Sequence, residues 1–289
     1  MEKILITGHT LTLEELAAVC RDNAPVALAP EAKQRILESR QVVDMLVDEA
    51  AVVYGITTGF GKFSDVTITQ DECRQLQRNL IVTHAVGAGD PFPRDVARGI
   101  MLLRVNNLAK GFSGTRLELV ETLVAMLNRG VTPVIPQKGS LGASGDLAPL
   151  SHMVLPMLGL GQAEYEGEVL PGDVAMERAG IPTVELVAKE GLALINGTQA
   201  MTSVGALAVY DAIGLMKAAD IAAAMSFEAN RGVEDALDPR VHAVRPHDGQ
   251  MKTAANLRNL LFGSGNVTCQ GEIRVQDGYS LRCVPQVHG

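Results

Sequence analysis

The sequence lacks the features that mark secreted and metal-binding proteins. Its 289 residues hold only four cysteines, which are widely scattered and form no CxxC pair: Cys20, Cys73, Cys269 and Cys283. Disulfide-rich secreted domains need denser cysteines, so we expect reduced thiols in a cytoplasmic protein. The six histidines include no HExxH motif, and His242 and His247 are five residues apart in a proline-containing stretch. That spacing is loose for a helical ligand pair, and we expect no metal site.

Basic clusters and long hydrophobic runs are absent as well. Lys and Arg number 25 against 33 Asp and Glu, a formal net charge of -8, whereas proteins bind phosphate backbones through clustered Lys and Arg. The most apolar stretches, such as 153–160, are far shorter than the about 20 residues of a membrane-spanning helix. Charged residues such as Asp211 and Lys217 interrupt the alanine-rich segment 201–229. We therefore expect neither nucleic acid nor a membrane as a partner.

Helix signals dominate the residues that are present. Apolar residues make up 47% of the chain and charged residues 20%, which is the mixture of an ordinary folded domain. Capping boxes at 12–15, 69–72 and 115–118 predict three helix starts. Pro30 predicts a further start, and Gly130 predicts the end of the helix that follows the third box.

The fold is therefore predicted to be mainly α, a long-helix bundle with a smaller mixed N-terminal part. Segment 201–229 is typical of one long helix buried on most sides, because its many alanines permit close helix packing. Strand signals are confined to 3–6 and 131–136. A glycine-rich connector is expected to divide the chain into an N-terminal mixed α domain, 1–112, and a partial central helical bundle, 113–289.

The most unusual stretch is 139–150, with the sequence GSLGASGDLAPL. A phosphate loop would carry a lysine after its last glycine, where Asp146 stands instead and would repel phosphate. A hydrolase nucleophile elbow, GxSxG, would place its second glycine one residue later than Gly145. The chemistry that remains is a reaction of the Ala-Ser-Gly triplet with itself.

In a tight bend, Ala143, Ser144 and Gly145 can cyclise. The amide nitrogen of Gly145 attacks the carbonyl carbon of Ala143, because glycine hinders neither partner. Loss of water closes a five-membered ring, and loss of the Ser144 hydroxyl as a second water leaves an exocyclic methylene. The product is an electrophile, which none of the twenty side chains supplies.

Five motifs in chain order carry a resemblance to a known family. They are YGITTGFG at 54–61, LQRNL at 76–80 followed by His84, GASGDLAPL at 142–150, NGT at 196–198 and QDGYSLRC at 276–283. Together they resemble the aromatic amino acid ammonia-lyases, in which a methylidene-imidazolone forms from Ala-Ser-Gly. The histidine at position 84 and the YSLRC form are similar to the histidine ammonia-lyases within that family. Family members are considerably longer, so the chain resembles their N-terminal half.

The resemblance implies a reaction that needs no metal and no nucleotide. The implied cofactor is the methylidene-imidazolone formed from Ala143, Ser144 and Gly145. The implied reaction eliminates ammonia from L-histidine and gives trans-urocanate. Family members are homotetramers whose active sites draw on several subunits, and the resemblance extends this expectation to the present chain.

The resemblance also assigns roles to residues outside the triplet. They comprise the catalytic tyrosines Tyr54 and Tyr279, the substrate-binding residues His84, Asn196, Gln276 and Arg282, and Asp146 in support. A tyrosine base needs its pKa lowered from about 10, and an arginine binds a carboxylate through two parallel hydrogen bonds. The histidine would contact the substrate imidazole, and the two amides would polarise the electrophile or the substrate.

Each assigned residue also has a purely structural alternative. Tyr54 could be a packing tyrosine, and His84 a satisfied core histidine. Arg282 could be a solvated arginine, and the two amides could be turn or cap residues. Asp146 could be the N-cap of a helix over 147–158, a role that does not exclude the first.

Two other functions stay open on the sequence alone. The chain could be a catalytically inactive structural fragment of such an enzyme. It could also be a tyrosine or phenylalanine ammonia-lyase, or a related aminomutase, since these share the same electrophile.

Overall fold

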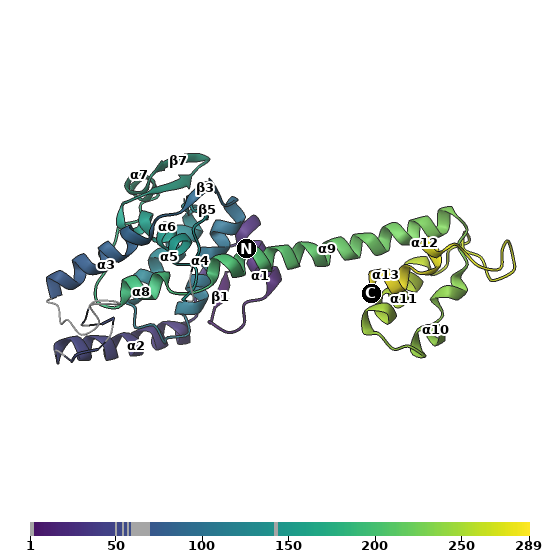
Figure 1. The fold of residues 1–289 in the computed structure, drawn as a ribbon, viewed down its shortest axis with the longest axis horizontal. Helices are drawn as coiled ribbons and strands as arrows, with labels where there is room; N and C mark the ends of the chain where they lie inside the picture. The colour runs from purple at the N-terminus through teal and green to yellow at the C-terminus, as the bar shows by residue number, and fades with distance from the viewer. Residues whose placement is uncertain (1–2, 50, 54, 57, 59–69, 142–143) are drawn as a thin grey trace. The chain divides into compact units, whose positions relative to one another are not determined.

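The computed structural model describes residues 3–49, 51–53, 55–56, 58, 70–141 and 144–289 (Figure 1). The chain is mainly α, as the sequence predicts, and it forms two compact units: residues 1–208 (unit 1) and 209–289 (unit 2). Helices α4 (Arg94–Leu108) and α5 (Leu117–Arg129), on either side of residue 112, pack against each other within unit 1. The domain boundary expected after residue 112 stays a prediction.

The elements of unit 1 begin with a strand and alternate between helices and short strands. In chain order they are β1 (Ile4–Ile6), α1 (Leu13–Arg21), β2 (Val26–Leu28), α2 (Pro30–Asp48), α3 (Gln70–His84), β3 (Ala88–Pro91), α4, α5, β4 (Thr132–Pro133), β5 (Pro136–Lys138), α6 (Leu147–Val154), η2 (Leu155–Leu158), β6 (Gln162–Tyr165), β7 (Glu168–Pro171), α7 (Gly172–Arg178) and α8 (Glu190–Ile195). Helix α9 (Gln199–Ala229) then runs from unit 1 into unit 2.

The helix starts predicted at 12–15 and at Pro30 are confirmed; the helix predicted after 115 also forms and ends at Gly130, but without the predicted capping box. Thr12 and Glu15 form the full capping box of α1, and Pro30 occupies the first turn of α2. Helix α5 begins at Leu117, after an N-cap residue whose side chain makes no capping bond, so the box at 115–118 does not form. The backbone N–H at position 116 donates instead to the carboxylate of Glu190. The box at 69–72 begins outside the described residues.

Helix α4 is the central helix of unit 1. Its residues Ile100, Leu102 and Val105 are fully buried, and α1, α5 and α6 pack around it. The apolar faces of these helices therefore meet in one core, and the small sheets lie at its margin. Strands β1 and β2 pair in parallel, β3 pairs with β5, and β4, β6 and β7 form an antiparallel sheet. The strand predicted over 3–6 is confirmed, and the extended segment 131–136 contributes to both β4 and β5.

Helix α4 also buries a charge completely, that of Arg98. The Arg98 guanidinium donates to the carbonyl oxygen of Val19 at 2.8 and 3.0 Å and to that of Leu127 at 3.1 Å. These carbonyls lie in the last turns of α1 and α5, where a helix leaves its carbonyl groups without internal partners. Arg98 thus joins the carboxyl ends of two helices to α4.

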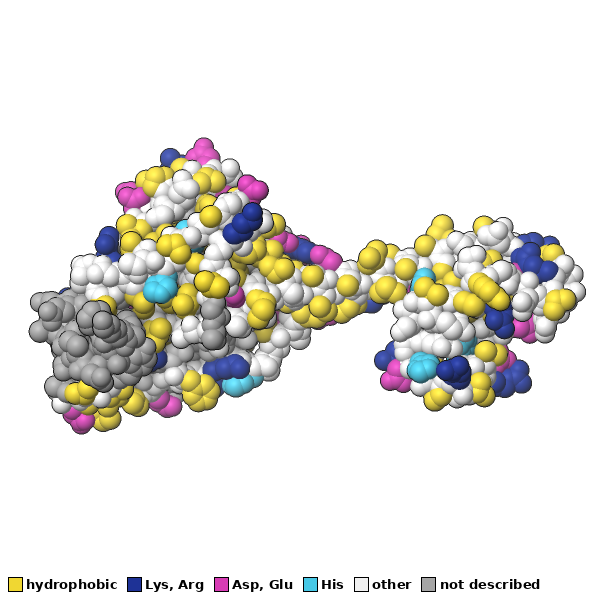
Figure 2. Space-filling model, viewed as in Figure 1, with side chains coloured by type: hydrophobic (Ala, Val, Ile, Leu, Met, Phe, Trp, Pro, Cys, Tyr) yellow, Lys and Arg dark blue, Asp and Glu magenta, His cyan; other side chains and the backbone are white. Residues whose placement is uncertain are grey.

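Helix α9 is a single long helix, as predicted, but the prediction that it is buried on most sides is wrong for this chain. Apolar residues along it are exposed, among them Met201, Leu215 and Met225, and Figure 2 shows hydrophobic side chains along the helix. A helix with this many apolar residues is expected to be buried by other elements. The described residues bury it at only a few positions, such as Ser203 and Phe227.

One helical stretch of the described chain, Glu190–Ala229, is long and apolar enough to cross a membrane by length and composition alone. Its most apolar part has a mean hydropathy of 1.3, and 39% of that part is buried. The core helix of a soluble protein meets the same criteria. The expectation of no membrane partner, which depended on interrupting charges such as Asp211 and Lys217, stays a prediction.

Unit 2 contains the remainder of α9 and a set of shorter helices. They are η3 (Glu234–Leu237), α10 (Pro239–Ala243), α11 (Asp248–Leu261), α12 (Tyr279–Arg282) and α13 (Val284–His288). Helix α11 packs against α13, and Phe227 of α9 is buried with Leu257 and Val284 in the core of this unit.

Candidate active site

Gly145 and Asp146 lie against the turn that joins α8 to α9. The Asp146 N–H donates to the carbonyl oxygen of Gly197 at 2.6 Å. Gly145 has a φ of 116°, and a Cβ atom added there would lie 2.2 Å from the same carbonyl oxygen. No side chain tolerates that approach or favours that φ, so position 145 requires glycine. Ser144 is exposed.

Asp146 is a buried carboxylate with two donors from different parts of the chain. Its Oδ1 accepts from the Ser140 hydroxyl at 2.7 Å, and its Oδ2 accepts from the Met201 N–H at 2.9 Å. Asp146 occupies the N-cap position of α6, but its side chain makes no capping bond there. Its carboxylate satisfies the first turn of α9 instead, where backbone N–H groups lack helical partners.

Asn196 ends α8 with an exposed side chain, and a buried arginine holds its backbone. Arg104 of α4 donates through Nη1 to the carbonyl oxygens of Ala193 and Asn196, both at 3.2 Å. Burial lowers the pKa of Arg104 to about 10, an effect that the Asp146 carboxylate opposes. The cation therefore lies near the acid that closes the triplet loop.

His84 is the last residue of α3, and among the described residues only one of its ring nitrogens has a partner. Nδ1 lies 2.8 Å from the carbonyl oxygen of Leu80. A carbonyl only accepts, so Nδ1 carries the hydrogen and Nε2 of the neutral ring keeps its lone pair. The half-buried ring is fixed at one nitrogen and presents the other, which is more than a satisfied core histidine does.

The segment after His84 is tied to the base of the triplet loop. The Gly87 N–H donates to Nε2 of His152 in α6 at 3.0 Å, and burial lowers the pKa of that imidazole. A Cβ atom on Gly139, where the loop begins, would lie 3.1 Å from the Cα atom of Gly87. Helices α3, α6 and α8 pack against one another. These contacts connect the elements that carry His84, Asp146 and Asn196.

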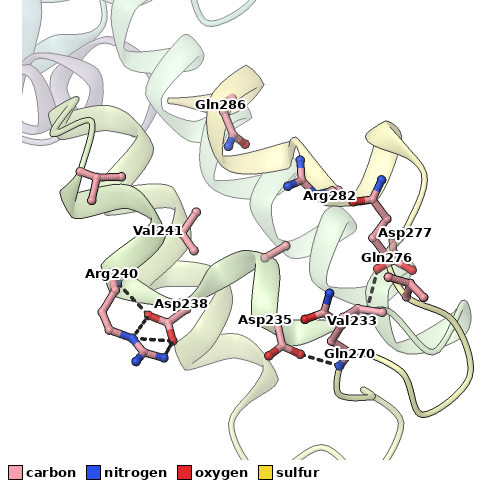
Figure 3. A pocket seen from close by; sticks show the side chains of 13 residues that line it. Val233, Asp235, Asp238, Arg240, Val241, Gln270, Gln276, Asp277, Arg282 and Gln286 are labelled. Carbon is pink, nitrogen blue, oxygen red and sulfur yellow. Dashed lines mark hydrogen bonds and ion pairs between the residues drawn. The ribbon is translucent and has the colours of Figure 1, made fainter.

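Unit 2 holds a cavity of about 660 Å³, which is lined by Gln276 and Arg282. They lie at α12 and just before it, and Asp235, Asp238 and Arg240 line the cavity from η3 and the start of α10 (Figure 3). Asp238 pairs with Arg240 at 2.6 Å. No described residue pairs with the Arg282 guanidinium. Of the two arginines that line the cavity, Arg282 thus has no ion-pair partner within the described part of the chain.

Asp277 anchors the loop that carries Gln276. The carboxylate is buried, and its Oδ2 accepts from the Val233 N–H at 2.7 Å. Its Oδ1 accepts from Arg274 Nε at 2.5 Å. The loop is thereby fixed to the segment that follows α9.

Comparison with known proteins identifies the family and the fold. A model of the aromatic amino acid lyase family matches residues 11–289. This chain belongs to that family. A lyase from Clostridium tetani named histidine ammonia-lyase is 60% identical over 289 residues, which are 100% of this chain and 56% of that protein. The chain thus spans about half the length of the curated relatives it matches.

Solved structures of lyase-family proteins have the same fold. The crystal structure of histidine ammonia-lyase from Trypanosoma cruzi is 40% identical, with a TM-score of 0.89, and the match covers 100% of this chain and 53% of that one. Tyrosine aminomutase from Streptomyces globisporus is 36% identical, with a TM-score of 0.91 over 99% of this chain and 58% of that one. The family resemblance and the mainly α fold are therefore confirmed.

The described site residues of this lyase-family chain are divided between the two units. Those in unit 1 are Ser144, Gly145, Asp146, His84 and Asn196, and those in unit 2 are Gln276, Tyr279 and Arg282. Tyr279 is 74% exposed and does not line the cavity. Tyr54 and Ala143 lie outside the described residues. Within the part of the chain that the structure describes, no cluster of three His, Cys, Asp or Glu side chains is arranged to hold a metal ion.

The residues around the triplet fit the prosthetic group that the family implies. Gly145 approaches the Gly197 carbonyl as only glycine can, and the Asp146 carboxylate is bonded on both oxygens. These contacts fix the backbone at Gly145 and Asp146, and a fixed backbone at the residue whose nitrogen would close the ring suits cyclisation of the triplet. Sequence reasoning missed Arg104, whose only signal is a charged residue within the apolar run of α4.

Proposed function

We propose that this chain supplies part of the active site of a cytoplasmic ammonia-lyase that converts L-histidine to trans-urocanate and ammonia. The observation that carries the proposal is the approach of Gly145 to the Gly197 carbonyl, since it bends the triplet where the ring would close. Curated relatives named histidine ammonia-lyase, at 54–61% identity, support L-histidine as the substrate.

The prosthetic group in this proposal is the methylidene-imidazolone formed from Ala143, Ser144 and Gly145. It supplies an electrophilic methylene for the elimination. Asp146 and Gly197 hold the loop that carries it through the 2.6 Å bond between their backbones. No metal and no nucleotide takes part.

His84 and Asn196 act from unit 1 in this proposal. The Nε2 lone pair of His84 accepts the N–H of the substrate imidazole, because Nδ1 is already committed to Leu80. That bond selects a ring with a hydrogen donor over a plain phenyl ring. The exposed Asn196 side chain offers both a donor and an acceptor close to the triplet.

Arg282 and Gln276 act from unit 2. A guanidinium with no described partner binds the substrate carboxylate through two parallel hydrogen bonds, and Gln276 on the same cavity adds a neutral donor. Tyr54 is the proposed base that removes the proton, with Tyr279 in support. We propose a homotetramer with active sites shared between subunits, as the family resemblance implies.

The test combines mass and turnover. The intact mass of the purified protein is measured first, and a deficit of two water molecules in the peptide that carries Ser144 is the expected result. L-histidine, L-tyrosine and L-phenylalanine are then offered separately, and trans-urocanate is the product expected. An unmodified triplet would contradict the proposed prosthetic group, and turnover of tyrosine without histidine would contradict the proposed substrate.

A variant of His84 tests the proposed contact between this residue and the substrate imidazole. His84→Phe removes the acceptor but keeps a ring, and we expect KM for L-histidine to rise at least about tenfold, since a good hydrogen bond is lost. The two-water deficit should persist in this variant. An unchanged KM would remove His84 from the substrate site.

A further inference from the structure

Arg104 is a buried cation directly behind the triplet loop. Its side chain is 1% exposed, and no carboxylate within the described part of the chain pairs with it. It bonds the carbonyl oxygens of Ala193 and Asn196, at the carboxyl end of α8, where a helix carries partial negative charge. Arg104 therefore fixes the backbone of the turn between α8 and α9.

Two polar atoms around Gly197 have no partner among the residues that the structure describes. They are Nη2 of Arg104 and Oε1 of Gln199, both buried. The former lies 2.5 Å and the latter 2.3 Å from the place that a Cβ atom would take on Gly197. Burying unpaired polar atoms is unfavourable, and such groups are retained where they serve a purpose other than stability.

The turn that Arg104 fixes is in direct contact with Gly145 of the triplet and with Asp146. The Gly197 carbonyl accepts the Asp146 N–H at 2.6 Å, and it leaves no room for a Cβ atom on Gly145. Arg104 thus bonds the carbonyl of the Asn196–Gly197 peptide, and the carbonyl of the next residue, Gly197, contacts Gly145 and Asp146. A shift of this peptide would release the bend at Gly145.

We propose that Arg104 is a positioning residue for cyclisation of the triplet: through the Asn196–Gly197 turn it holds the Gly197 carbonyl in the place that fixes the backbone at Gly145, the residue whose nitrogen closes the ring. The inference rests on the proposed function, because it requires that the triplet cyclises. Arg104 touches none of the reacting atoms, so it acts through the Asn196–Gly197 turn.

The reaction that Arg104 assists needs no oxidant or other reactant. A bond forms between the Gly145 nitrogen and the Ala143 carbonyl carbon, and the carbonyl oxygen leaves as water with the amide protons of Gly145 and Ser144. The second water takes the Ser144 hydroxyl and the proton on its Cα atom. Positioning matters here because an amide nitrogen is a weak nucleophile, and holding it near its target raises the rate of ring closure.

The test compares Arg104→Met with Arg98→Met in the full natural chain. Both arginines are buried on α4 and donate to backbone carbonyls of other elements, and Arg104 also donates to Oδ1 of Asn107 at 3.4 Å. The two changes therefore remove similar chemistry from one helix. Two quantities are measured: the fraction of protein that has lost two waters, and the hydrogen-exchange rate of the Asp146 amide. We expect Arg104→Met to lose most of the two-water deficit and to speed Asp146 exchange at least about tenfold, while Arg98→Met changes neither.

Equal behaviour of the two variants in both measurements would overturn the inference. If Arg104→Met does not fold, Arg104→Lys and Arg98→Lys are compared in the same way, and a slower two-water loss in the former alone supports it. If the unchanged protein shows no two-water deficit, the proposed function fails. The exchange rate of the Asp146 amide then still decides whether Arg104 holds the turn.

Discussion

Replacement of Glu190 by glutamine tests how the start of α8 is held. Glu190 is fully buried, and each of its oxygens accepts two hydrogen bonds. Oε1 accepts from the N–H and Nε of Arg116, both at 3.0 Å. Oε2 accepts from Nη2 of Arg116 at 2.9 Å and from the Val187 N–H at 3.0 Å. The same helix ends at Asn196, so the pair also supports the site.

The magnitude follows from those four bonds. Glutamine turns an NH₂ group toward two donors whichever way its amide faces, so two of the four bonds are lost. Bonds to charged groups contribute about 1.5–3 kcal/mol each, and the Arg116 side chain is 32% exposed, so water recovers part of the loss. We expect Glu190→Gln to lower the free energy of unfolding by about 3–4 kcal/mol, a large part of the about 5–15 kcal/mol typical of a domain.

The assay is urea unfolding followed by circular dichroism, with Glu118→Gln as the matched control. Glu118 pairs with the same arginine at 3.3 Å, but its side chain is 64% exposed. An exposed pair contributes less than about 1 kcal/mol. If the two variants unfold within about 1 kcal/mol of each other, the reasoning from burial and bond count is refuted.

Three further predictions concern the site and its supports. Gly145→Ala should abolish the two-water deficit in the intact mass, because its Cβ atom would lie 2.2 Å from the Gly197 oxygen; a deficit in this variant would contradict the bend. Burial lowers the pKa of His152, so the unfolded chain binds a proton more readily and stability should fall as pH drops below about 6.5. Urea midpoints at about pH 7.5 and about pH 5 measure this effect, and His152→Gln should show less difference between them. Asp277→Asn should lower the unfolding free energy by about 2–3 kcal/mol, measured by urea unfolding, since it weakens both bonds of a buried carboxylate.

Helix starts could be predicted from sequence where the capping partners are close in the chain. Thr12 and Glu15 satisfy each other within one turn, so the pattern was sufficient. At residues 115–118 the same pattern precedes a helix but forms no capping box, and the N–H of the actual N-cap, Arg116, donates to Glu190, 74 residues away. Sequence reasoning missed the β6–β7 hairpin. Its two turn residues, Glu166 and Gly167, both have positive φ, as this tight turn requires.

For the site as well, the sequence indicated local features but not contacts between distant residues. The Ala-Ser-Gly triplet could be named from its residues, and the glycine at position 145 anticipated the unusual backbone there. The bond of Asp146 to Met201 spans 55 residues and has no local signal. The apolar residues of α9 predicted that the helix is buried, but they do not tell which chain supplies the residues that bury it.

Arg98 has a consequence for behaviour in acid. A helix carboxyl end carries about half a negative charge, so the ends of α1 and α5 together balance the guanidinium. Burial lowers the pKa of Arg98 only to about 10, and carbonyl groups do not titrate, so neither side of this pairing changes between neutral and acidic solution. A pair between a carboxylate and a cation is, by contrast, lost when the acid is protonated. The contact of α1, α4 and α5 through Arg98 is therefore the part of unit 1 best suited to persist at low pH.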